Sequence, residues 1–329
     1  MKVTDMNVLR AIVLIAASFL LTVGPVRAQN AYPSKPVRMI VPFPPGGPAD
    51  LIARVMAQKL SEEFGKQFYV ENHSGAGGNL GVGIGAHEPA DGYSMIVNSQ
   101  ATVTNRSLYK SLPYDPFKDL IAVTRIATTP NVIVVHPSVP AKTMKELVEL
   151  IRSGDDKYHG YAHPGLGTPS NLSGELFRLT QNLKLTSIPF GGGGPMIQSV
   201  VAGHTPIAFS SLPPASPHIQ AGRLRALAVT ADKRLGSLPD VPTMAEAGYP
   251  DQTAETPIGI FVPAGTPKEI VDLLHRKVVA LVATADVKQK LANIGFAPIG
   301  DTPAEFTAFL KGEDEKWGKV IRDAGIKME

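Results

Sequence analysis

Short apolar segments alternate with amphipathic segments along most of this chain, and this alternation limits the possible folds more than any other feature. Residues 38–43 form an apolar run that fits a buried strand, and residues 49–64 place their apolar side chains on one helical face. The same order recurs, with strands predicted at 67–71, 93–98 and 132–136 and a glycine-rich helix at 79–86. We therefore expect an α/β fold whose sheets are mostly parallel.

A second series of strand segments follows residue 157. One sheet that held every strand of both series would be unusually wide, so we expect two smaller sheets. The further strands are predicted at 158–162, 185–189, 206–210, 224–230 and 257–262, before two long C-terminal helices.

Several helix starts are marked by a threonine three residues before a glutamate. This capping-box spacing occurs at Thr143, Thr266 and Thr302, and at the last two a proline takes the first helical position. Residues 242–248 resemble a short capped helix that ends at a glycine.

The N-terminus has the pattern of a secretory signal peptide. A short basic region precedes the uncharged apolar run 11–23, and small residues before Gln29 predict cleavage after Ala28. The run is too short to span a bilayer comfortably, so a membrane anchor is the weaker interpretation. We expect a periplasmic protein of 301 residues, since 28 of the 329 are removed.

Composition then excludes several classes of protein. The segment before the cleavage point carries Lys2, Asp5, Arg10 and Arg27, so its loss lowers the net charge from +3 to +1. A nearly neutral protein gives no reason to expect nucleic acid or an anionic membrane as a partner. The sequence contains 0 Cys, which excludes disulfides and thiolate chemistry, and its scattered histidines do not predict a metal site.

The loops that follow the predicted strands are rich in glycine and small polar residues and contain no Lys or Arg. They are residues 43–50, 72–79, 98–100, 163–170, 190–195 and 210–211. Parallel sheets bind ligands beyond the carboxyl ends of their strands, and free backbone N–H groups at helix starts attract anions. Any one loop could need glycine only for a tight turn, but the set predicts a binding cleft.

The loop at 42–50 shows how such a loop can present its backbone to a ligand. Its prolines lack an N–H and stiffen the exit from the strand, and Gly46 and Gly47 let the backbone come close to a ligand. Pro48 suits the first helical position. Asp50 either satisfies backbone N–H groups in the first helical turn or accepts a hydrogen bond from the ligand, and the sequence leaves both open.

Enzyme motifs are weak or absent from the sequence. Residues 81–86 match the dinucleotide pattern G-x-G-x-x-A, but they start about nine residues after the strand, and no acidic residue ends the next strand. The sequence has no P-loop, no G-x-S-x-G and no H-E-x-x-H motif. Ser99, Ser170, Ser210 and Ser211 would be nucleophiles only with a histidine base beside them.

Ordered blocks of the sequence resemble the Bug-type extracytoplasmic solute receptors, the substrate-binding components of tripartite tricarboxylate transporters. The resemblance covers nearly the whole chain after the signal segment. The blocks are FPPGGPAD at 43–50, GAGGN at 75–79, DGY at 91–93, LPYD at 112–115, GTPS at 167–170, LRALAVT at 224–230 and LPDVPT at 238–243.

The resemblance implies a type II periplasmic-binding-protein fold, with two α/β domains joined by two crossover segments and a ligand cleft between them. Domain 1 would comprise residues 29–130 and 255–329, and domain 2 residues 131–254. In this family the cleft loops hold a carboxylated ligand through backbone groups and ordered waters. The matching positions are Phe43, Pro44, Pro45, Gly46, Gly47, Asp50, Gly75, Ala76, Ser99, Gly165, Gly167, Thr168, Ser170, Phe190 and Gly191.

Two departures from the family pattern fall in these loops. His73-Ser74 stand where the family usually has Arg-Pro, and Phe190-Gly191 stand where it usually has Tyr-Lys. Two polar contacts to the ligand are therefore expected to be absent.

The resemblance implies a monomeric receptor without cofactor or catalytic activity, which captures a small organic acid and delivers it to integral membrane permease subunits. Two alternatives stay open. One is a receptor that feeds a sensor kinase, and the other is a secreted hydrolase on the same fold, which would need a histidine beside one of the cleft serines.

Overall fold

The long strand β4 (Leu120–Val135) connects both series of strands into one sheet. The computed structural model describes residues 32–328, and the elements below belong to the compact unit that begins at Lys35. The predicted signal peptide lies outside the described residues. No helix among the described residues is long and apolar enough to cross a membrane.

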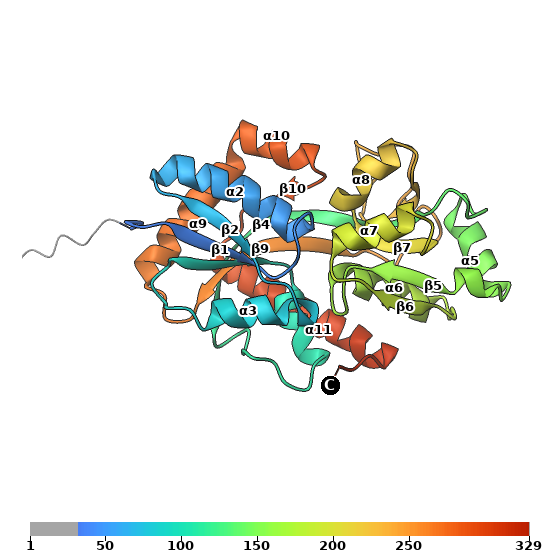
Figure 1. Ribbon diagram of the computed structural model, residues 1–329, viewed down its shortest axis with the longest axis horizontal. Coiled ribbons are helices and arrows are strands. Elements are labelled where there is room, and N and C mark those ends of the chain that lie inside the picture. The colour runs from blue at the N-terminus through green and yellow to red at the C-terminus, as the bar shows by residue number, and fades with distance from the viewer. Residues whose placement is uncertain (1–31, 329) are drawn as a thin grey trace, which may run out of the picture. The chain divides into compact units, whose positions relative to one another are not determined.

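The first series of elements precedes β4. Its strands and helices are β1 (Val37–Val41), α2 (Pro48–Phe64), β2 (Phe68–Asn72), the 3₁₀ turn η1 (Ala76–Gly78), α3 (Asn79–Ala86), β3 (Ser94–Asn98), α4 (Ala101–Thr104) and η2 (Asn105–Ser107). β1 pairs in parallel with β2 and β3, and Figure 1 shows α2 and α3 on opposite sides of these strands.

The second series follows β4, and a C-terminal group completes the fold. The second series contains α5 (Met144–Arg152), η3 (Asp156–Tyr158), β5 (Gly160–His163), α6 (Pro169–Thr180), β6 (Thr186–Pro189), α7 (Gly193–Val201), β7 (Ile207–Ser211), α8 (Leu212–Gln220) and β8 (Arg225–Val229). The C-terminal group contains β9 (Glu255–Pro263), α9 (Lys268–Ala283), α10 (Ala285–Asn293), β10 (Ala297–Pro298) and α11 (Pro303–Ala324).

The sheet order is β2-β1-β3-β9-β4-β7-β5-β6, with β8 and β10 also paired to β4. β9 pairs antiparallel with β4 from Leu120 to Pro130, and β7 takes over from Asn131 to Val135. Figure 1 shows β4 and β9 side by side across the middle of the molecule. The prediction of two separate sheets is therefore wrong. The prediction of mostly parallel pairing is also wrong, because every pair that β4 makes is antiparallel.

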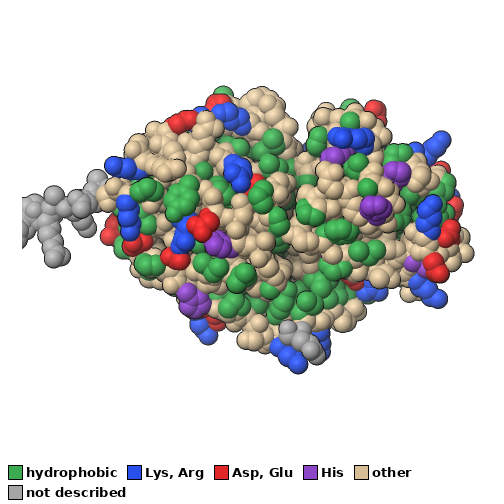
Figure 2. Space-filling model, viewed as in Figure 1, with side chains coloured by type: hydrophobic (Ala, Val, Ile, Leu, Met, Phe, Trp, Pro, Cys, Tyr) green, Lys and Arg blue, Asp and Glu red, His purple; other side chains and the backbone are tan. Residues whose placement is uncertain are grey.

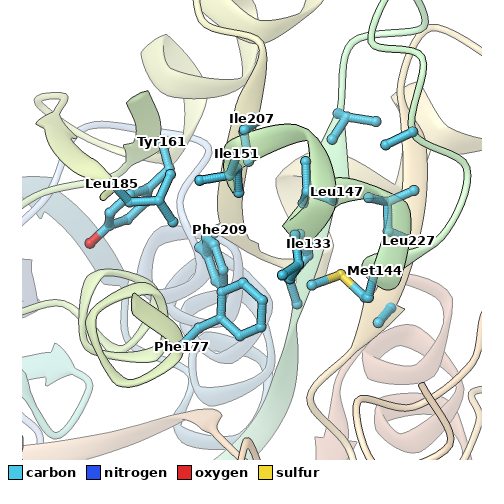
Figure 3. Packing of buried hydrophobic residues seen from close by; sticks show 14 of the residues in the cluster. Ile133, Met144, Leu147, Ile151, Tyr161, Phe177, Leu185, Ile207, Phe209 and Leu227 are labelled. Atoms are coloured by element: carbon cyan, nitrogen blue, oxygen red, sulfur yellow. The ribbon is translucent and has the colours of Figure 1, made fainter. Parts of the chain in front are cut away.

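The strand residues of the second series alternate between two cores. Ile133 and Phe209 belong to a cluster with Phe177 of α6, whereas Val132 and Ala208 belong to another, which contains buried residues of α7. Because successive strand residues point to opposite faces, α6 and α7 cover opposite faces of β7. Figure 3 shows Phe177 and Phe209 in contact at the centre of the first cluster, where their rings lie 5.8 Å apart.

Two of the predicted helix starts are confirmed, and two are wrong. Thr302 forms the expected capping box with Glu305, and the side chain of Thr143 caps α5. Thr266 is not a cap, because its hydroxyl donates to the carbonyl of Pro263 and α9 starts one residue later. Residues 242–248 form turns instead of the predicted helix, although Thr243 and Glu246 make reciprocal hydrogen bonds.

The glycines of α3 serve helix packing, which explains the resemblance of residues 81–86 to a dinucleotide motif. A Cβ added at Gly81 would meet the Pro42 backbone at 2.8 Å, and one at Gly83 would meet the ring of Pro113 at the same distance. A Cβ at Gly85 would overlap the side chain of Ile96, which is fully buried. The helix lies against β1 and β3 because these positions lack side chains.

We predict that Gly85→Ala lowers the free energy of unfolding by about 1–3 kcal/mol, because the new methyl group overpacks against Ile96. The matched control is Gly312→Ala in α11, where a Cβ has nothing within 4 Å. That change should raise stability by about 0.5–1 kcal/mol, because glycine weakens a helix interior. Urea unfolding measures both, and equal effects of the two substitutions would contradict the packing argument.

Candidate functional site

Two adjoining pockets lie where both series of strands end. The first, named here the Ser99 pocket, has a volume of about 40 Å³, and the second, the Phe190 pocket, about 270 Å³. Phe43 and Pro164 line both, so the pockets are neighbours. The Ser99 pocket is lined by Phe43, Gly47, Pro48, Ala49, Asn98, Ser99, Pro164, Thr168, Pro169, Ser170, Gly193, Ser211, Thr256 and Ile258. The Phe190 pocket is lined by Phe43, Gly75, Ala76, Gly77, Gly78, Tyr109, Pro164, Gly165, Leu166, Pro189, Phe190, Gly191 and Met328.

Most of the predicted site residues line one of these pockets. Phe43, Gly47, Ser99, Thr168 and Ser170 line the Ser99 pocket. Phe43 also lines the Phe190 pocket, together with Gly75, Ala76, Gly165, Phe190 and Gly191. Pro44, Pro45, Gly46, Asp50 and Gly167 line neither.

Several of these five residues hold the loops in place. A Cβ added at Gly192 would meet the Pro44 ring at 3.0 Å, and one at Gly194 would lie 3.7 Å from the Pro45 carbonyl. The loop after β1 therefore touches the start of α7. Gly167 has φ of 74° and lies so close to Asn105 that a side chain there would collide with it.

Asp50 fixes the shape of the loop after β1. Its Oδ2 accepts hydrogen bonds from the Gly46 N–H at 3.0 Å and the Arg54 Nε–H at 2.9 Å, and its Oδ1 accepts from Asn72 at 3.0 Å. Burial would raise the pKa of the Asp50 carboxyl, but these hydrogen bonds outweigh it and the pKa lies below its usual value. With all these donors engaged and only 2 % of the residue exposed, Asp50 acts as a loop brace.

Four helices begin at the Ser99 pocket. Gly47 and Pro48 start α2, Thr168 and Pro169 start α6, Gly193 starts α7, and Ser211 is the N-cap of α8. Among the described residues no side chain caps α2, α7 or α8. The backbone N–H groups that their first turns retain beside the prolines therefore remain available to a ligand.

The charge around the site comes from these helix ends. None of the residues that line either pocket is Asp, Glu, Lys or Arg. Each helix places a partial positive charge at its N-terminus, so the Ser99 pocket favours an anion although it holds no cation. Figure 2 shows few charged side chains in the middle of the visible face.

A buried polar cluster centred on Asn131 supports one wall of the pocket. The Asn131 Oδ1 accepts from the Ser170 hydroxyl at 2.7 Å and from the Thr256 hydroxyl at 3.3 Å. Its amide nitrogen donates to the carbonyl of Ala254, and its backbone N–H donates to Thr230. Asn131 is fully buried and thereby ties β4, α6 and β9 together beside the site.

Sequence reasoning missed several lining residues. Asn98 and Ser211 belong to the predicted cleft loops 98–100 and 210–211 but were not named as site residues, although they end β3 and β7. Thr256 and Ile258 lie in β9, and their approach depends on the pairing of β9 with β4, which no local pattern reveals. Tyr109 and Met328 come together through a parallel bridge between distant segments.

The hydrolase alternative needs a histidine beside one of the cleft serines, and among the described residues no histidine is hydrogen-bonded to Ser99, Ser170, Ser210 or Ser211. Ser170 and Ser210 donate to an amide and a carbonyl oxygen, and Ser99 accepts from a backbone N–H. His163 does contact a hydroxyl, that of Ser187, at 2.6 Å from Nε2. However, the N–H of Gly165 donates to Nδ1, so Nε2 carries the proton and cannot act as a base.

Comparisons with known proteins identify the family of this chain. Residues 52–326 match the model of the tripartite tricarboxylate transporter family receptors. The protein BugT of Bordetella pertussis is 33% identical over 98% of this chain and 100% of its own. A protein from the tcbD-tcbE intergenic region of Pseudomonas sp. (strain P51) is 36% identical over 96% of this chain and 94% of its own.

Solved structures of proteins with bound carboxylates also resemble this chain. The R. palustris protein Rpa4515 with adipate has a TM-score of 0.87 and 35% identity, and covers 90% of this chain and 99% of its own. MatC from Rhodopseudomonas palustris with bound malate has a TM-score of 0.83 and 30% identity, and covers 88% of this chain and 100% of its own. The α/β architecture predicted from the sequence is thereby confirmed.

His163 should make stability depend on pH. Burial lowers the pKa of His163 from 6.5 to about 4, so the folded protein keeps it neutral while the unfolded chain is protonated in this interval. The unfolded state then binds more protons, and the free energy of unfolding falls as the pH is lowered from about 6.5 to about 4.

We predict that His163→Asn, which retains an acceptor for the Gly165 N–H, shows a smaller loss of stability between pH 7 and pH 5 than the wild type. His204→Asn is the control, because His204 is exposed. Urea unfolding at both pH values measures the difference. An unchanged pH dependence in His163→Asn would show that His163 is not the responsible group.

Proposed function

Because the chain belongs to the tripartite tricarboxylate transporter receptors and is of the Bug type, we propose that it is a periplasmic receptor that binds a small carboxylate in the Ser99 pocket. In this proposal it delivers the acid to the membrane permease subunits of a tripartite tricarboxylate transporter. The observation that carries the proposal is the meeting of four helix N-termini at a pocket without charged side chains.

The chemistry of this pocket suits one carboxylate group. Two carboxylate oxygens accept hydrogen bonds from several N–H groups at once, and the helix dipoles stabilise the negative charge. The first turns of these helices contain prolines at 48, 169, 195, 213 and 214, which have no N–H group. The donors that remain are few, so they suffice for one carboxylate group. The relatives with adipate and malate support a carboxylate ligand.

We propose further that the chain moves as two domains, 29–130 with 255–329 and 131–254. Two features support this division. The partner of β4 changes from β9 to β7 between Pro130 and Asn131. Two hydrophobic clusters lie wholly within residues 131–254 and a third lies wholly outside them, whereas a fourth, which contains Leu172 and Trp317, joins the two sides.

The size of the Ser99 pocket supports movement between these domains. A space that holds one water measures about 10–15 Å³ on the same scale, so about 40 Å³ accommodates only a few waters. The loop after β1 touches the start of α7 across the pocket. A dicarboxylate therefore enters only after these loops separate.

We predict that calorimetry detects binding of mono- or dicarboxylates and that citrate binds more weakly than the tightest of them. Neither pocket offers the Arg or Lys that would pair with a fully ionised tricarboxylate. A panel in which citrate binds far more tightly than every smaller acid would reject the charge argument. If no organic acid binds, the proposed function fails.

The substitution Gly47→Val should abolish binding and leave the fold intact. Gly47 has φ of −81°, which valine adopts, and a Cβ there meets only the Pro44 carbonyl at 3.8 Å. The rest of the valine side chain would occupy the small pocket. Gly236→Val is the control, because Gly236 is exposed, lies outside both pockets and has open space around it. Wild-type affinity in Gly47→Val, measured by calorimetry, would refute the assignment of the site.

Domain closure predicts a change of shape on binding. We expect saturating ligand to reduce the radius of gyration measured by small-angle scattering, because hinge motion brings the two sides of the cleft together. The control is the Gly47→Val protein with the same ligand, which should give no change. Identical scattering curves with and without ligand, with binding confirmed by calorimetry, would contradict the hinge.

A further inference from the structure

The Ser99 pocket offers hydrogen-bond acceptors as well as donors, and these acceptors bear on the kind of acid that it binds. Asn98 lines the pocket and is 1 % exposed, and its Oδ1 is buried without a hydrogen-bond partner among the described residues. A buried acceptor without a partner is costly, so such an atom at a binding site points to a donor on the ligand.

The orientation of the Asn98 amide follows from its neighbours. The hydroxyl of Thr102 donates to the carbonyl of Ser99 at 3.0 Å, so its oxygen is left to accept. It accepts from the Nδ2 of Asn98 at 2.9 Å. The amide nitrogen thus takes the Thr102 side, and Oδ1 is the atom that lacks a partner.

Two hydroxyl groups of the pocket are also oriented as acceptors. The protons of Ser170 and Thr256 are both directed to Oδ1 of Asn131, at 2.7 and 3.3 Å. Each hydroxyl oxygen keeps a free lone pair. Together with Asn98 they give the pocket three side-chain oxygens that can accept from a ligand.

The charge of the site selects between the possible donors. An ammonium group would meet the positive ends of four helices, and no acidic side chain lines either pocket to compensate it. A neutral hydroxyl group donates one hydrogen bond without adding a charge. A keto group only accepts, so it cannot pair with Oδ1 of Asn98.

We infer that the ligand is a hydroxycarboxylate whose hydroxyl group donates to Oδ1 of Asn98 while its carboxylate lies at the helix N-termini. This inference rests on the proposed function, since it assumes that the pocket binds a carboxylate. It adds a specificity-determining residue, Asn98, and a positioning residue, Thr102, which fixes the Asn98 amide.

Two series of acids with a constant skeleton test the inference by calorimetry. The first is succinate, malate, oxaloacetate and aspartate, and the second is glutarate, 2-hydroxyglutarate, 2-oxoglutarate and glutamate. Within each series the substituent is hydrogen, hydroxyl, keto or ammonium. In at least one series we expect the hydroxy acid to bind about ten- to a hundredfold more tightly than the other three.

Variants separate the role of Asn98 from general damage to the site. Asn98→Leu should abolish the preference for the hydroxy acid over its unsubstituted counterpart, because the apolar side chain has a similar size but offers no acceptor. Thr102→Val should reduce the preference, because the Asn98 amide is then free to turn, and Thr102→Ser should preserve it. Far-UV circular dichroism and cooperative urea unfolding show that each variant is folded.

The outcomes distinguish the inference from the proposed function. If organic acids bind but no hydroxy acid exceeds its unsubstituted, keto or amino counterpart, the inference is overturned and the proposed function stands. The same holds if the preference survives in Asn98→Leu. If no acid in the calorimetric panel or in either series binds, the proposed function fails and the inference falls with it.

Discussion

The antiparallel pairing of β4 with β9 is the interaction on which the rest of the structure depends. It joins segments more than a hundred residues apart and runs from Leu120–Pro263 to Pro130–Glu255. Without it the two series of parallel strands would have no common sheet. At its end the side-chain amide of Asn131 holds the starts of α6 and β9, so the place where β4 changes partner supports a wall of the pocket.

This arrangement explains how a site without charged side chains favours an anion. Strand ends from both series point to one place, and each is followed by the start of a helix. The positive ends of the helices therefore meet, while prolines and glycines keep the lining small and uncharged. In the first turn of α2, Asp50 pairs with Arg54 and accepts a hydrogen bond from the N–H of Gly46, whose φ is 86°.

Local patterns predicted those parts of the fold that depend on local forces. The strands and most helices lie within a few residues of their expected positions, because apolar periodicity and proline or threonine starts fix them. The loops at the strand ends were predicted to line a cleft for the same reason, and Phe43, Gly47, Ser99, Thr168 and Ser170 line the Ser99 pocket. The direction of β9, the single sheet and the contribution of Thr256 arise from pairing across the chain, which local patterns do not encode.

The departures from the family pattern affect the two pockets differently. Phe190 and Gly191 line the larger pocket, and a Cβ at Gly191 has nothing within 4 Å, so the absence of the usual Tyr-Lys pair leaves this pocket apolar and open. His73 contacts Glu71 at 2.6 Å and lines neither pocket. Under the proposed function, the Ser99 pocket then fixes the carboxylate group, which every ligand of this kind has in common. The Phe190 pocket then receives the part of the ligand that extends beyond the carboxylate and the group that contacts Asn98.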